Sequence, residues 1–145
     1  MKIRQFDRRD LARILKIEQA SFAGDAWDAR LFEQYHRRCP ELFLVAQLGR
    51  RIAGYAITCV ESSGVELVSL GVDPRDRRMG VAQALLDEMA DKLRVQKKRT
   101  WWLMVETVNT GAIRFYEQYG FSTVRIVKGY YGRGRDAWRM RLKLR

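Results

Sequence analysis

Apolar and polar residues follow two different periods along the chain, and the changes of period divide it into strands and helices. The imperfect alternation of residues 2–6 predicts a first strand. Apolar residues at helical spacing then predict a helix over residues 11–22, with Asp7 as its N-cap. Asp28 can cap a second, shorter helix, which should end before Pro40 because proline disfavours a helical conformation in the preceding residue.

Three strands are expected next, joined by short turns. The buried run 42–48 passes through a glycine turn into 52–60, and strands joined so tightly should pair antiparallel. A third strand is predicted over 65–72. It should end at Asp73 and Pro74, because proline cannot donate a hydrogen bond to a strand ladder.

The second half of the chain alternates helices with strands. The clearest helical pattern covers residues 81–93, whose apolar side chains fall on one face. Four further elements are predicted, in the order strand, helix, strand and strand, over 100–107, 109–119, 121–128 and 137–144. A strand, a crossover helix and a strand should leave 65–72 and 100–107 parallel and adjacent.

Length and composition bound the class of protein. The 145 residues, 47% of them hydrophobic, suffice for one domain over 1–145 with a real core, and are too few for two. No uncharged apolar run approaches the roughly 18 to 20 residues that span a bilayer, and the N-terminus lacks a signal-peptide core, so we expect a cytoplasmic protein without a membrane partner. The net charge of +11 favours an anionic ligand or a weak association with RNA.

The cysteines and the histidine give no sign of a metal site. Cys39 and Cys59 lie far apart and outside any C-x-x-C spacing, so neither a disulfide nor zinc is expected. Free cysteine is usually a small buried hydrophobe. His36, the single histidine, lies in a polar segment that reads as a solvated helical face.

The residues from Glu66 to Leu93 join a strand, a basic turn and a helix. Such a junction directs several backbone N–H groups and the positive end of a helix dipole at one point, which suits a phosphate. The glycines do not match the dinucleotide pattern G-x-G-x-x-G, and G-x-x-x-x-G-K-[ST] is absent. The predicted ligand therefore carries phosphate but is neither a nicotinamide dinucleotide nor a nucleoside triphosphate.

This stretch and a second motif together resemble the GNAT N-acetyltransferases. The family's phosphate loop follows [QR]-x-x-G-x-[GA], which Arg77, Gly80 and Ala82 match. Its second signature, N-x-x-A-x-x-F-Y-x-x-x-G-F, is matched by Asn109, Ala112, Phe115, Tyr116, Gly120 and Phe121. Within the family, the chain looks most like the bacterial ribosomal-protein-alanine acetyltransferases, whose ending is echoed by Tyr130 and Tyr131.

The resemblance implies a fold and a donor. The fold would be α/β (α+β), with about four helices and a mixed, mostly antiparallel sheet of about seven strands in which one parallel pair splays. The donor would be acetyl-CoA, with no metal. The implied donor-binding residues are Leu70, Gly71, Val72, Arg77, Arg78, Met79, Gly80, Val81, Ala82, Gln83, Asn109 and Tyr116. Small residues at 80 and 82 would let the pyrophosphate approach the backbone amides, and Gly71 would be the bulge residue that splays the parallel strands.

The resemblance also implies how acetyl transfer would proceed. A backbone N–H near Leu70 or Val72 would polarise the thioester carbonyl, and Tyr116 would protonate the departing sulfur. The position of the usual base holds Met104, which cannot accept a proton. Glu66 is the preferred replacement, Glu106 is a second candidate, and a mechanism without a dedicated base stays open.

The acceptor is the least defined part of the prediction. We expect a protein or peptide N-terminal amine, ribosomal in kind, because an α-amino group has a pKa of about 7.7 to 8.0 and is partly neutral at pH 7, whereas lysine is near 10.4. Trp27, Tyr130 and Tyr131 would line the acceptor cleft by analogy. If Glu66 acts as the base, lysine is again a candidate acceptor. Two further alternatives stay open: acetylation of a small amine such as a polyamine or amino-sugar, and a catalytically silent domain that binds CoA or RNA.

Overall fold

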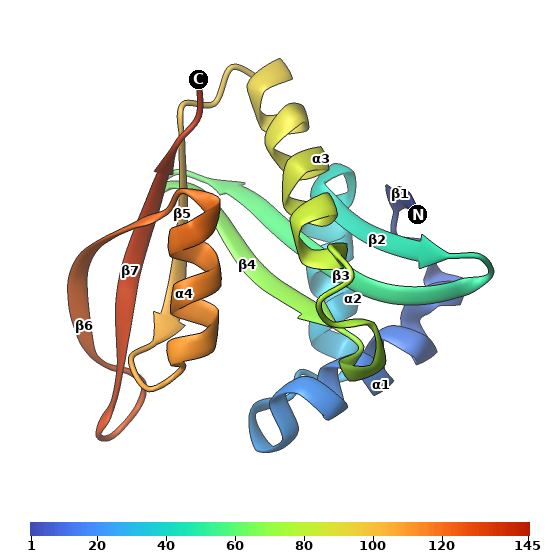
Figure 1. The fold of residues 1–145 in the computed structure, drawn as a ribbon, viewed down its shortest axis with the longest axis horizontal. Coiled ribbons are helices and arrows are strands. Elements are labelled where there is room, and N and C mark those ends of the chain that lie inside the picture. Colours follow the sequence, from blue (N-terminus) through green and yellow to red (C-terminus); the bar gives the residue numbers. More distant parts are fainter. The chain divides into compact units, whose positions relative to one another are not determined.

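The computed structural model describes residues 1–145 and contains seven strands and four α-helices (Figure 1). In chain order these are β1 (Lys2–Gln5), α1 (Leu11–Phe22), α2 (Ala29–Arg38), β2 (Phe43–Leu48), β3 (Arg51–Glu61), β4 (Gly64–Val72), α3 (Val81–Val95), β5 (Thr100–Glu106), α4 (Thr110–Tyr119), β6 (Ser122–Gly132) and β7 (Arg135–Lys143). The strands are hydrogen-bonded in the order β1-β2-β3-β4-β5-β7-β6. The predicted mixed α/β fold is confirmed.

The ladders have the predicted directions. β1 with β2, β2 with β3, β5 with β7 and β6 with β7 all pair antiparallel. β4 and β5 form the predicted parallel pair, which joins Glu66 to Trp102 and Leu67 to Leu103. No helix is long and apolar enough to cross a membrane.

The chain divides into two compact units. The first comprises Met1–Cys59 and Val68–Lys92, and the second comprises Val60–Leu67 and Leu93–Arg145. A single domain over the whole chain therefore stays a prediction.

In the first unit, helices cover both faces of the strands because side chains alternate along β3. Tyr55 points to one face, where its ring lies 5.4 Å from Phe32 of α2. Gly54 points to the other, where a Cβ atom would lie 3.0 Å from Val81 and 3.4 Å from Leu85 of α3. The core on the Tyr55 face consists of Phe6, Ile14, Ile17, Phe32, Phe43, Val45, Ile52, Tyr55, Ile57 and Cys59.

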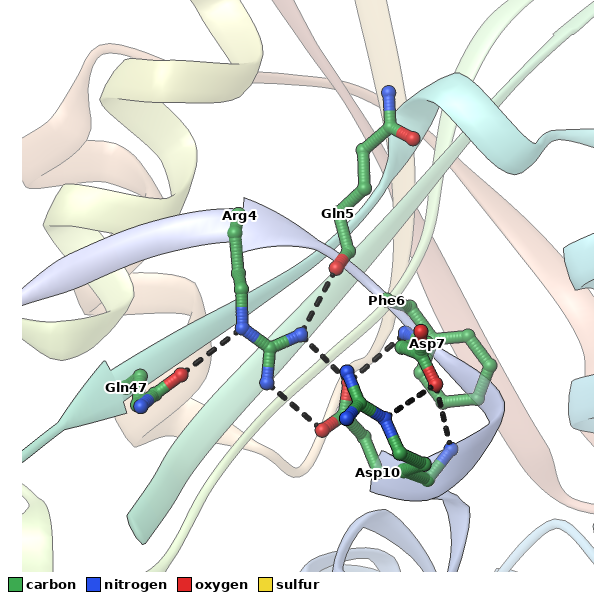
Figure 2. Close-up of a pocket in the computed structure, with 7 residues that line it drawn as sticks. Arg4, Gln5, Phe6, Asp7, Asp10 and Gln47 are labelled. Carbon is green, nitrogen blue, oxygen red and sulfur yellow. Dashed lines mark hydrogen bonds and ion pairs between the residues drawn. The ribbon is translucent and has the colours of Figure 1, made fainter. Parts of the chain in front are cut away.

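A network of charged side chains fixes the entry into α1. Asp7 and Asp10 form a capping box around the short 3₁₀ helix Arg8–Asp10, which runs directly into α1. Figure 2 shows the Arg4 guanidinium donating to both oxygens of Asp10, at 2.8 and 2.9 Å, and to Gln47 at 2.9 Å. The charged side chains that line the pocket drawn in Figure 2 are paired with one another, so we assign this pocket to stability rather than to ligand binding.

Cys39 and Cys59 form a disulfide, so the prediction of free cysteines is wrong. Cys39 follows the last turn of α2 and Cys59 lies on β3, where their Cα atoms are 5.5 Å apart. Packing of α2 on the sheet creates this proximity, which a separation of 20 residues does not reveal. His36 also departs from expectation, since its ring is half-buried 4.9 Å from the ring of Phe6.

In the second unit, β5 has one buried face and one half-buried face. Trp101, Leu103 and Val105 are buried on the side of α4, where the Trp101 ring lies 5.6 Å from that of Phe121. Trp102, Met104 and Glu106 alternate with them and are half-buried. The opposite face of β5 is therefore the side that carries the candidate catalytic positions.

β6 extends beyond the predicted strand 121–128 and includes Tyr130 and Tyr131. The ladder between β6 and β7 shifts register between Val127 and Gly132, and Gly129 has a φ of +67°. Because of this irregularity, the end of β6 lacks the strict alternation from which a strand is predicted.

Candidate active site

The end of β4, where the donor is predicted to bind, packs against Tyr55. A Cβ atom at Gly71 would lie 2.6 Å from Cε1 of the Tyr55 ring, so only glycine fits there. Val68 packs in the same cluster as Tyr55, and Ser69 Oγ lies 2.9 Å from the Tyr55 hydroxyl. Successive residues of a regular strand face opposite sides, whereas Val68 and Ser69 both lie on the Tyr55 side. The irregularity of β4 therefore lies at Val68 and Ser69, before Gly71, where the bulge is predicted.

The phosphate loop is open and its backbone is shaped for an anion. Arg78 and Gly80 have φ angles of +67° and +75°, a conformation that turns successive N–H groups toward one side. Nothing lies within 4 Å of a Cβ position at Gly80, which leaves room for a ligand against the backbone. The Gly80 carbonyl accepts the Ala84 N–H at 3.0 Å, so the first amides of α3 have no partner within the helix. These residues fit a pyrophosphate.

The side chains around this loop have different roles. Arg77 donates to Ser21 Oγ at 3.3 Å, and Met79 is exposed. Val81 is buried against Gly54, so its amide rather than its side chain is available to a ligand.

Asp73 holds the turn that leads into the loop, a role that the sequence did not suggest. Its carboxylate accepts the Arg75 N–H at 2.9 Å and pairs with Arg13. Burial alone would raise the pKa of Asp73, but the hydrogen bonds from Arg75 and Arg13 hold that pKa well below its usual range.

The predicted acid, Tyr116, lies on α4. Asn109 caps this helix through Oδ1, which accepts the Ala112 N–H at 3.2 Å. The Tyr116 ring is half-buried, 5.8 Å from the ring of Phe121. Burial raises the pKa of its phenol above the usual value, so the hydroxyl is protonated at neutral pH and can donate a proton.

Glu66, the preferred base, is half-buried on β4 opposite Trp102 of β5. Burial raises the pKa of its carboxyl, the positive charge of Arg139 opposes this, and Glu61 adds to it. The Arg139 guanidinium lies 4.1 Å from the centre of the Trp102 ring. The result is a carboxylate that holds its proton more strongly than an exposed glutamate.

Glu106 has a different environment from Glu66. Both of its oxygens accept hydrogen bonds from the Arg135 guanidinium, each at 2.9 Å. A carboxylate paired in this bidentate way is less available to accept a proton from a substrate.

The position of the usual base is occupied by the apolar side chain of Met104. Met104 lies opposite Arg139 of β7, and its backbone carbonyl accepts the Tyr131 hydroxyl at 3.1 Å. Burial and neighbouring acidic groups raise the pKa of Tyr131 to about 12, so Tyr131 is a hydrogen-bond donor rather than a base.

The candidate residues fall into both units. The second unit contains Glu66, Glu106, Tyr116, Tyr130 and Tyr131, whereas the first contains the phosphate loop, the end of β4 and Trp27. The Trp27 ring stacks on Tyr35 with 4.9 Å between ring centres, and its N–H donates to Glu18 at 3.0 Å. No group of three or more His, Cys, Asp or Glu side chains is arranged to hold a metal.

An open, glycine-bearing loop at the start of α3, the strand β4 that precedes it and a tyrosine on α4 are the features that the sequence predicts for an acyl-CoA-binding acyltransferase. A family model described as "Acetyltransferase (GNAT) family" matches residues 9–121. The chain belongs to this family and is an N-acetyltransferase with acetyl-CoA as the donor.

Similar proteins agree with this assignment. The "[Ribosomal protein bS18]-alanine N-acetyltransferase" of Escherichia coli strain K12 is 33% identical over 129 residues, which cover 89% of this chain and 86% of the relative. The "N-terminal acetyltransferase B complex catalytic subunit NAA20" of Arabidopsis thaliana is 31% identical over 98% of this chain and 84% of that protein. The crystal structure of Ard1 from Thermoplasma volcanium superposes with a TM-score of 0.93 at 31% identity, covering 99% of this chain and 97% of that one.

Proposed function

We propose that this chain transfers the acetyl group of acetyl-CoA to the α-amino group of a protein or peptide, with a ribosomal protein as the kind of acceptor. The observation that carries this proposal is the state of the three candidate base positions. Met104 cannot accept a proton, Glu106 is paired with Arg135, and only Glu66 has a carboxylate without a bidentate partner. Such a site suits an amine that needs little help to lose its proton.

The magnitudes favour an α-amine over a lysine. With a pKa of about 7.7 to 8.0, an α-amino group is roughly 10 to 17% neutral at pH 7. A lysine with a pKa near 10.4 is about 0.04% neutral under the same conditions. A site in which Glu66 is the one candidate carboxylate without a bidentate partner can therefore act on an N-terminus, which does not need the strong base that a lysine requires.

The donor would be held by backbone groups more than by side chains. The amides from Arg78 to Gln83 would bind the pyrophosphate, with Arg77 and Arg78 adding positive charge. The pantetheine arm would pair with Leu70, Gly71 and Val72 as an added strand. Asn109 would contact the donor through Nδ2, since Oδ1 caps α4.

Two residues would handle the protons. Glu66 would accept the proton that the amine loses, and Tyr116 would donate one to the leaving sulfur. The raised pKa of Tyr116 keeps its hydroxyl protonated, as a donor requires. Trp27, Tyr130 and Tyr131 would contact the acceptor.

A ribosomal acceptor would place the enzyme in the cytoplasm. Disulfides are rare in the cytoplasm outside hyperthermophiles, so the redox state of Cys39 and Cys59 in the cell tests the predicted location. Trapping of free thiols in freshly lysed cells would report whether the bond exists at the site of action.

The experiment that tests the function compares acceptors with labelled acetyl-CoA. The set comprises a peptide with a free N-terminus, an N-terminally blocked peptide with one lysine, spermidine and glucosamine. We expect transfer chiefly to the free N-terminus. Faster transfer to spermidine or glucosamine would favour a small-amine enzyme instead. CoA binding without transfer to any acceptor would favour a silent domain, and RNA binding with a steep salt dependence would then point to the basic surface.

A further inference from the structure

We propose that Glu18 and Tyr55 are positioning residues that hold the acceptor loop, residues 23–28, in a fixed place relative to the donor strand, residues 68–72. All of these residues lie in the first unit. The inference rests on the proposed function in one respect, since it takes Trp27 as a contact of the acceptor and Gly71 as a contact of the donor.

Glu18 is the centre of the arrangement. It lies in α1 and is 2% exposed. One carboxylate oxygen accepts the Trp27 N–H at 3.0 Å, and the other accepts the Tyr55 hydroxyl. Both partners are neutral, and a buried acidic group without a cation beside it is unfavourable unless its hydrogen bonds are made. The position of this carboxylate is therefore tied to both partners.

Tyr55 extends the contact to the donor strand. It is fully buried, and its hydroxyl lies 2.9 Å from Ser69 Oγ as well as bonding to Glu18. Its ring occupies the space that a side chain at Gly71 would need. One side chain thus touches the acid that holds the acceptor loop and two residues of the strand that is predicted to bind the donor.

The acceptor loop has an open side at Gly24 and an unfavourable backbone conformation at Ala23. Nothing lies within 4 Å of a Cβ position at Gly24, and Ala23 has a φ of +41°, which is unfavourable for a residue with a Cβ atom. The Ala26 N–H reaches only the Ala23 carbonyl within the loop, at 3.1 Å. The bond from Trp27 to Glu18 joins the loop to a buried position of α1, next to the Trp27 ring, which stacks on Tyr35.

Loss of this link should change acceptor binding more than donor binding. If the loop shifts, Trp27 moves with it, whereas the phosphate loop keeps its own contacts to Ser21 and Asp73. The expected signature is a rise in KM for the peptide with little change in KM for acetyl-CoA.

The test uses one disruptive and one conservative change at Glu18, together with Tyr55→Phe. Glu18→Ala removes both acceptors, and Tyr55→Phe removes the hydroxyl while keeping the ring against Gly71. Glu18→Gln can rearrange: its carbonyl accepts the Trp27 N–H, its amide donates to Tyr55, and Tyr55 donates to Ser69. Glu41→Gln, at an exposed acid outside the site, is the matched charge control.

Peptide kinetics and amide hydrogen exchange are measured on each variant. We expect about a tenfold rise in KM for the peptide in Glu18→Ala and Tyr55→Phe, a KM for acetyl-CoA within about twofold, and near wild-type values in Glu18→Gln and Glu41→Gln. Exchange at Trp27 should be about tenfold faster in the two impaired variants.

Other outcomes would overturn the inference. A lower melting temperature with unchanged KM values and unchanged exchange at Trp27 would make the pair purely structural. Equal impairment of Glu18→Gln and Glu18→Ala would show that the charge, not the hydrogen bonding, matters. A wild type that acetylates no peptide refutes the proposed function separately, and exchange at Trp27 then decides alone whether Glu18 and Tyr55 hold the loop.

Discussion

Replacing Gly71 by alanine tests how closely the donor strand packs on Tyr55. The new Cβ atom would lie 2.6 Å from Cε1, 3.0 Å from Cζ and 3.1 Å from the hydroxyl oxygen of the Tyr55 ring. Carbon atoms in contact prefer about 3.5 to 4.0 Å, so either the ring or the strand must move. Tyr55 is fully buried among Phe32, Phe43 and Glu18, which leaves the ring no free direction.

The expected loss of stability follows from this overpacking. One extra methyl group in a well-packed core destabilises a protein by about 1 to 3 kcal/mol. For a chain of 145 residues this corresponds to a fall in Tm of about 3 to 10 °C. If the strand moves rather than the ring, the KM for acetyl-CoA should also rise, because the strand is the proposed partner of the pantetheine arm.

Thermal unfolding and donor kinetics are measured on Gly71→Ala and on a matched control, Gly111→Ala. Nothing lies within 4 Å of a Cβ position at Gly111 on α4, so alanine there should be neutral or slightly stabilising. In the Tyr55→Leu background, Gly71→Ala should cost less than it does in the wild type, since leucine lacks the ring atoms that clash. A Gly71→Ala variant as stable as Gly111→Ala would refute the close packing.

Three further predictions concern the chemistry and the disulfide. Glu66 must be ionised to accept a proton and burial raises its pKa, so kcat should fall as the pH drops through that raised pKa. In pH–rate profiles, Glu66→Gln should lower kcat about tenfold or more and Glu106→Gln much less. A larger loss of kcat in Glu106→Gln than in Glu66→Gln would make Glu106 the base. Tyr116→Phe keeps the ring packing and should lower kcat about 100-fold or more at saturating substrates, whereas an unchanged kcat would leave Tyr116 with packing alone. Reduction of the Cys39–Cys59 bond, which closes a loop of 20 residues, should lower the free energy of unfolding by about 3 kcal/mol, and identical denaturation midpoints with and without reductant would contradict this.

Much of the fold could be predicted because strong local patterns and tertiary packing agree. The apolar stripe of α3 buries the face that the sequence predicts. Asp28 and Asn109 cap α2 and α4 as expected, because an N-cap is a local interaction between a side chain and a nearby amide.

What the sequence did not reveal depends on contacts between distant residues. Glu18 reads as one polar position in a helix, and only the fold brings it to Tyr55, 37 residues away. The disulfide has the same origin, since α2 and β3 must pack before Cys39 meets Cys59. The pairing of Glu106 with Arg135 likewise depends on a hairpin with an irregular register. This pairing makes Glu106 a weaker candidate base than Glu66.

The position of the acetyl group on a product shows whether the acceptor is an α-amino group. One peptide with both a free N-terminal alanine and an internal lysine is incubated with the enzyme and acetyl-CoA, and fragment masses locate the modification. We expect acetyl on the α-nitrogen, with the lysine unmodified. Acetyl on the lysine Nζ, with the N-terminus free, would contradict it.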